Sequence, residues 1–200
     1  MADGLALAQA VCTRLCHDLG GPTGALAGAL ELLEGEADEA SEVANDAVRI
    51  IDRRLRFWRV AVGGAAGDLD AQALAQLAEG LTLGRRAQVS LEGVAPGTTV
   101  PPAMVQPLLL AMLVGVEAMP RGGTLRVAGS EAEGFAVQPD GPSAAWPVGL
   151  SALLGGDSPA LTPRGVALPL LAATAAAGQV RLELRDAGGP ATLMLATRSH

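Results

Sequence analysis

Two long segments with helical periodicity, joined by a short turn, most constrain how this chain can fold. The first runs from about Leu5 to Leu33 and the second from about Asp38 to Val62. In residues 34–39, a glycine ends one helix and acidic residues favour the start of the next. Two helices of similar length joined in this way form an antiparallel hairpin. One hairpin cannot bury its apolar stripe on all sides, so we expect a homodimer in which two hairpins form a four-helix bundle.

The first helix has one narrow apolar stripe. Because an α-helix turns about 100° per residue, residues three and four apart share a face. The residues of this stripe are Ala8, Cys12, Leu15, Leu19, Pro22, Leu26, Leu30 and Leu33. Pro22 lies inside the helix, where we expect a kink.

His17 lies almost opposite this stripe, so its imidazole should face solvent. The other histidine of the chain, His200, is the last residue. Small residues share the His17 side, and we interpret them as a docking face for another protein: Thr13, Gly20, Gly21, Gly24 and Gly28. Glycine costs about 1 kcal/mol against alanine in a helix interior, so four glycines on one face need a reason. The alternative is a helix with an exposed histidine among small residues.

The second helix carries a cluster of arginines in an otherwise acidic chain. Arg49, Arg53 and Arg56 share one face, and folding the hairpin brings residues near Leu55 level with His17. We therefore expect these arginines beside the histidine, where they would attract a phosphoryl group or an acidic partner surface. Ion pairs within the helix, such as Asp46 with Arg49, are the alternative.

A glycine-rich linker at residues 63–67 predicts a boundary between residues 1–65 and residues 68–200. Beyond it, helical and strand patterns alternate, which predicts an α/β sandwich and an α+β chain overall. We expect helices at 69–83, 101–119, 144–154 and 163–177, and strands at 87–94, 124–128, 134–138, 179–185 and 191–197.

Composition excludes several classes of function. The 14 basic residues are all arginine, which excludes a P-loop and lysine Schiff-base chemistry. A net charge of −7 argues against nucleic acid and anionic membranes as partners. Cys12 and Cys16 fit a reduced compartment and offer too few ligands for a metal site. The longest apolar runs are shorter than a bilayer span, so we expect a cytoplasmic protein.

The motif His17-Asp18-Leu19-x-x-Pro22 is similar to the phospho-acceptor box of sensor histidine kinases. The resemblance implies that His17 accepts a phosphoryl group and that Asp18 orients its ring. The second part resembles the kinase ATP-binding domain, but its nucleotide residues are missing. Leu110 and Val114 stand where kinases have asparagines, and residues 139–142 lack the second glycine of the adenine box. We expect no ATP-dependent kinase activity.

This combination resembles the ChpT-type histidine phosphotransferases of alphaproteobacteria. The resemblance implies a phosphorelay in which His17 is loaded by the receiver domain of a hybrid histidine kinase. His17 then passes the phosphoryl group to the receiver of a response regulator. The receiver supplies Mg²⁺ and the chain has no cofactor of its own. A non-catalytic dimeric scaffold and a divergent ATP-dependent kinase remain as alternatives, and the sequence names neither the partners nor the direction of flow.

Overall fold

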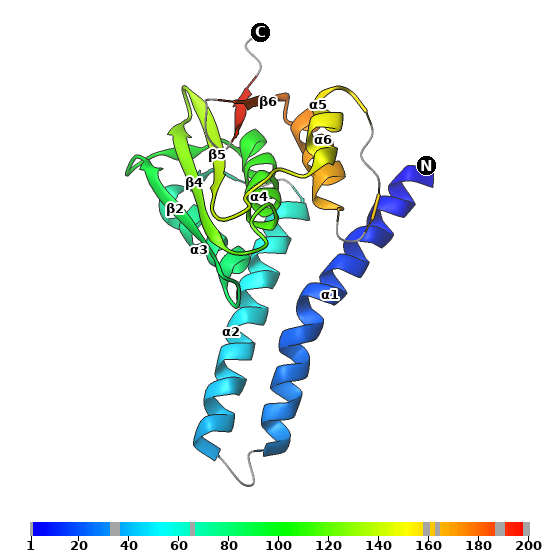
Figure 1. Cartoon of the computed structure of the whole chain (residues 1–200), viewed down its shortest axis with the longest axis vertical. Coiled ribbons are helices and arrows are strands. Elements are labelled where there is room, and N and C mark those ends of the chain that lie inside the picture. Colours follow the sequence, from blue (N-terminus) through cyan, green and yellow to red (C-terminus); the bar gives the residue numbers. More distant parts are fainter. Residues whose placement is uncertain are drawn as a thin grey trace.

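The computed structural model describes residues 2–32, 37–64, 67–157, 161–162, 165–186 and 191–197. It has N-terminal helices and a C-terminal α/β sandwich, as predicted (Figure 1). Helices α1 (Ala2–Leu32) and α2 (Ala37–Val62) lie side by side over their lower halves. Helix α1 is continuous through Pro22 and leans away from α2 toward its N terminus. Leu33, most of the turn and His200 lie outside the described residues.

The hairpin of one chain buries mainly small side chains between its helices. Ala29, Ala40 and Ala47 are buried, whereas Leu15 and Leu26 of the predicted stripe are only half-buried. Six large apolar side chains of the hairpin are exposed: Leu5, Leu30, Leu32, Val43, Val48 and Leu55. A single copy therefore leaves apolar surface on both helices uncovered.

The C-terminal part is built on a five-stranded mixed sheet in the order β2-β4-β5-β7-β6. Its elements are β1 (Leu69–Asp70), α3 (Ala71–Thr82), β2 (Ala87–Val94), β3 (Thr99–Val100), α4 (Pro102–Glu117), β4 (Gly123–Ser130), β5 (Gly134–Asp140), α5 (Val148–Leu154), α6 (Ala167–Ala177), β6 (Val180–Arg185) and β7 (Thr192–Thr197). Strands β2 and β4 are parallel and are connected through α4, and the other pairs of this sheet are antiparallel. Both predicted hairpins, β4–β5 and β6–β7, are present.

Sequence patterns placed some boundaries wrongly. Helix α5 begins at Val148 rather than at residue 144, because a proline disfavours helical angles at the residue before it, and Pro147 itself is the extended N-cap. Helix α6 begins at Ala167 rather than at residue 163. The two-residue strands β1 and β3, which pair antiparallel, were not expected, because two residues are too short to show a period.

Helix α4 is the centre of the core. Its residues Leu108, Leu109 and Leu110 are fully buried, and it packs against α6 and the sheet. Helix α4 ends in a turn in which Gly122 and Gly123 have φ angles of 89° and 143°. Residues with side chains rarely adopt these angles, so the glycines let β4 start directly after the helix.

Two contacts fix the hairpin on the C-terminal part. Helix α3 packs so closely on α2 that a Cβ at Gly80 would lie 2.5 Å from the Arg53 carbonyl oxygen. The Gln106 side chain on α4 donates hydrogen bonds to the carbonyl oxygens of Val60 (3.3 Å) and Gly63 (2.7 Å). The α2 end of the hairpin is therefore held against α3 and α4, which places the middle of α1 beside the C-terminal part.

Across the described ranges, none of the helices combines the length and the apolar character needed to cross a membrane.

Candidate functional site

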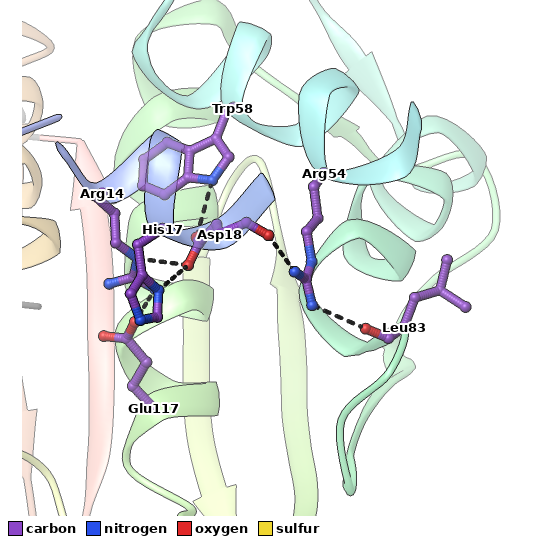
Figure 2. Close-up of polar contacts among 7 residues, drawn as sticks. All are labelled: Arg14, His17, Asp18, Arg54, Trp58, Leu83 and Glu117. Atoms are coloured by element: carbon purple, nitrogen blue, oxygen red, sulfur yellow. Dashed lines mark hydrogen bonds and ion pairs between the residues drawn. The ribbon is translucent and has the colours of Figure 1, made fainter. Parts of the chain in front are cut away.

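His17 lies in the middle of α1 and its side chain is 70% exposed, in agreement with its position on the helical wheel. Its ring is oriented with Nδ1 3.6 Å from Asp18 Oδ1 (Figure 2). That distance is longer than a hydrogen bond but within reach of a small ring rotation. The orientation turns Nε2 away from Asp18, so Nε2 is the nitrogen available to another molecule.

Asp18 is buried, with its side chain only 9% exposed, and it fastens α1 to α2. Its carboxylate accepts hydrogen bonds from Arg14 Nε at 3.0 Å and from Trp58 Nε1 at 3.3 Å. Arg54 on α2 donates to the backbone carbonyl of Asp18 and, at 3.5 Å, to that of Leu83 (Figure 2). Asp18 is therefore not an ordinary exposed carboxylate, and the group beside the His17 ring is fixed in position.

Arg14 extends this network to the C-terminal part. Its side chain is 7% exposed and reaches Glu117, the last residue of α4, with an N–O distance of 2.5 Å. The guanidinium also lies 5.9 Å from the centre of the buried Trp58 ring, in the range of a cation–π contact. Burial raises the pKa of the Glu117 carboxyl, against the opposing influence of Arg14. The charged form of this carboxylate thus depends on Arg14.

A cavity of about 360 Å³ opens at the histidine. Its lining residues are Arg14, His17, Asp18, Arg85 and Glu117. Arg85 comes from the turn between α3 and β2, so both parts of the chain form this cavity. Burial lowers the pKa of Arg54, and the nearby positive charges of Arg85 and Arg14 lower it further. Arginine stays protonated nevertheless, so three guanidinium cations, Arg14, Arg54 and Arg85, lie at or beside the cavity.

The predicted docking face on α1 is open. A Cβ added at Gly20, Gly21, Gly24 or Gly28 would meet nothing within 4 Å. The Thr13 hydroxyl donates to the Gln9 carbonyl of its own helix. At these four glycines the surface of α1 is therefore not covered by any described part of the chain.

The three predicted arginines pair with carboxylates away from the His17 cavity. Arg49 pairs with Asp46 and Arg56 with Asp52, each one turn away on α2. Arg53 pairs with Glu79 of α3 at 3.0 Å. The arginine of α2 that reaches α1 is instead Arg54, the residue after Arg53. One residue on a helix is a rotation of about 100°, and the sequence does not fix how α2 is rotated against α1.

Sequence reasoning missed four further residues at the site: Arg14, Trp58, Arg85 and Glu117. Only Arg14 had a local signal, since it precedes Asp18 by four residues, the spacing of a helical ion pair. Arg85 and Glu117 are distant in sequence, and only the packing of the two parts brings them to His17.

A second cavity, of about 370 Å³, lies between α4 and α6. Val114 lines it and is 2% exposed, and Leu110 is fully buried. Of the described residues that line it, only Glu117 is charged. Asp140, the acidic residue of the 139–142 segment that was compared with the adenine box, forms an ion pair with Arg126 at 2.9 Å.

Comparison with known proteins assigns the class. The model of the family described as the histidine phosphotransferase C-terminal domain matches residues 71–189. The chain belongs to this histidine phosphotransferase family, which confirms the resemblance seen in the sequence.

Two relatives agree with this assignment. Protein phosphotransferase ChpT of Brucella abortus (strain 2308) is 37% identical over 128 residues, which are 62% of this chain. The matched segment spans 60% of that relative's length. A solved structure of a bacterial phosphotransferase aligns with a TM-score of 0.77 and 26% identity, and covers 96% of both chains.

Proposed function

We propose that this chain is a cytoplasmic phosphorelay protein that carries a phosphoryl group on His17. The group arrives from the receiver domain of a hybrid histidine kinase and leaves to the receiver of a response regulator. One observation carries the proposal: an exposed imidazole opens onto a cavity lined by Arg14 and Arg85, beside the fixed carboxylate of Asp18. Membership of the histidine phosphotransferase family supports it.

The transfer step needs only groups at this site and the docked receiver. The lone pair of His17 Nε2 attacks the phosphorus of the receiver's aspartyl phosphate, and an N–P bond forms. The P–O bond to the receiver breaks, and its electron pair leaves on the receiver's carboxylate. The ring becomes positively charged, and Asp18 beside Nδ1 stabilises that charge. The receiver brings Mg²⁺ to the step, so the chain itself uses no metal or cofactor.

We propose that the chain does not use ATP. Binding of Mg²⁺-ATP requires oxygen ligands for the metal and positive or hydrogen-bonding groups for the phosphates. Leu110, in the core, and Val114, at the second cavity, provide neither. The Glu117 carboxylate at its edge would repel a triphosphate.

The glycine side of α1 is the proposed docking face for the receiver. Its four glycines let a partner backbone approach closely. Arg49, Arg53 and Arg56 on α2 each pair with a carboxylate of this chain, and they would contribute to docking by exchanging it for an acidic group of the partner. Partner binding and not nucleic-acid or membrane binding fits the net charge of −7.

We propose that a second copy of the chain covers the exposed apolar side chains of the hairpin. Leu30, Val48 and Leu55 are exposed in one copy, and pairing two hairpins would bury such residues in a four-helix bundle. We expect light scattering on the purified protein to give about twice the chain mass of 20.0 kDa. A single-chain mass at micromolar concentration would contradict the dimer.

The relay is tested with a phosphorylated receiver and the variant His17→Ala. We expect the wild-type chain to take up acid-labile label and the variant to take up none, because His17 is the only histidine among the described residues. Cys16→Ala is the matched control, since Cys16 is the exposed neighbour of His17 and has no role in the step. Undiminished label on His17→Ala would refute the relay. Receiver binding without label on the wild type would favour a scaffold.

A further inference from the structure

Arg85 lines the His17 cavity, and among the described residues no hydrogen bond or ion pair joins its side chain to Asp18 or Glu117. It is half-buried and reaches the cavity from the C-terminal part, from the turn that follows α3. It also lines an adjacent cavity of about 270 Å³, which it shares with Glu117 and Arg86. Its side chain thus lies at the boundary between the hairpin and the C-terminal part.

The charge of Arg85 is not neutralised by an ion pair. Within the described part of the chain, no carboxylate oxygen lies within 4.0 Å of its guanidinium. Arg14, by contrast, pairs with both Asp18 and Glu117. The charge of Arg85 nevertheless acts through space, because it lowers the pKa of both the Glu117 carboxyl and the Arg54 guanidinium. Arg85 is therefore a cation held beside the histidine with its hydrogen-bonding capacity unused by carboxylates.

The cavity as a whole has room for one more anion. Arg14 and Arg85 line it together with the carboxylates of Asp18 and Glu117, and Arg54, which donates to the Asp18 carbonyl, lies near both arginines, so these five groups carry one net positive charge. A phosphoryl group on His17 would bring up to two negative charges to this place. Arg14 and Arg54 already hold Asp18, so the arginine able to receive the new charge is Arg85.

We propose that Arg85 binds the phosphoryl oxygens during transfer and in the phosphorylated state of His17. This inference rests on the proposed relay function. The guanidinium keeps its protons throughout and only donates hydrogen bonds, while the N–P bond forms and the P–O bond to the receiver breaks. Arginine is suited to this role because its planar fork can engage two phosphoryl oxygens at once. The C-terminal part thereby contributes a catalytic residue to the hairpin's histidine.

Two variants of adjacent residues separate this role from general electrostatics. Arg85→Ala removes the proposed phosphoryl ligand, and Arg86→Ala removes an exposed arginine that does not line the His17 cavity. In single-turnover transfer from a phosphorylated receiver, we expect Arg85→Ala to lower the saturating rate about tenfold or more, with receiver affinity little changed. Arg86→Ala should transfer at the wild-type rate, and Arg85→Lys should recover part of the loss. Thermal unfolding of each variant checks that the fold is intact.

A spectroscopic measurement tests the contact directly. Phosphoramidate serves as a small phosphodonor that needs no receiver, and ³¹P NMR then follows the phosphoryl group on His17 as pH is varied. A bound guanidinium favours the dianion, so the second phosphoryl ionisation should move to higher pH in Arg85→Ala but not in Arg86→Ala.

Equal rates and equal ³¹P titrations for Arg85→Ala and the wild type would overturn the inference and leave the relay standing. An equal loss in Arg86→Ala would also overturn it, since the effect would then be one of overall charge. A wild-type chain that takes label from neither phosphoramidate nor a receiver would refute the relay itself, and with it the role of Arg85.

Discussion

The two cavities that meet at Glu117 are nearly equal in volume, about 360 Å³ at His17 and about 370 Å³ between α4 and α6, but opposite in lining. Among the described residues, all the side chains that line the first are ionisable, whereas Glu117 is the one charged side chain in the second. The volume of a cavity therefore does not identify the reactive site of this molecule, whereas the side chains that line it do. The charges gather where α1 meets the C-terminal part, and the cavity inside the sandwich is left to apolar contacts.

The largest effect on stability is expected from removing Arg14, the cation that pairs with both carboxylates of the charged cavity. Arg14→Ala leaves the buried Asp18 carboxylate without its ion pair and Glu117 without its partner, so we expect a loss of about 3 kcal/mol in the free energy of unfolding. Chemical denaturation measures it. Arg56→Ala is the control, because its exposed pair with Asp52 should contribute at most about 1 kcal/mol. Similar losses in both variants would mean that the buried ion pairs of Arg14 stabilise the fold no more than an exposed pair does.

The smallest effect is expected at the apolar cavity. A ligand present at 100 times its Kd stabilises a protein by about 2.7 kcal/mol, which a thermal shift readily detects. With millimolar Mg²⁺-ATP we expect no measurable change in Tm, because the described lining of this cavity holds no cation for the phosphates and Glu117 is already paired with Arg14. A clear rise in Tm would show that the second cavity binds nucleotide and would support the alternative of a divergent ATP-dependent kinase.

Much of the fold was predictable from local patterns. The apolar spacing located both helices of the hairpin, and the turn at Gly122 and Gly123 marked the start of β4. Strands β1 and β3 were missed because their structure comes from pairing across 30 residues and not from a pattern of their own.

The site was predictable only in part. The His17 motif and the exposure of the ring follow from the sequence along one helix. The choice of Arg54 over Arg53 and Arg56 depends on how α2 is rotated, and the arrival of Arg85 and Glu117 depends on how the two parts pack. The burial of Asp18 was also hidden, because it requires Trp58 of the second helix and Arg14 of the first at the same point.

The hydrogen bonds from Gln106 to the end of α2 have a consequence for the speed of any chemistry at His17. They restrict rotation of the hairpin against the sandwich, so the entropy of bringing Arg85 to the histidine is lost when the chain folds and not when a partner docks. Groups already oriented in this way react as if present at very high effective molarity. A docking receiver would then have to position only its own phosphoryl group, against a site whose two halves are already assembled.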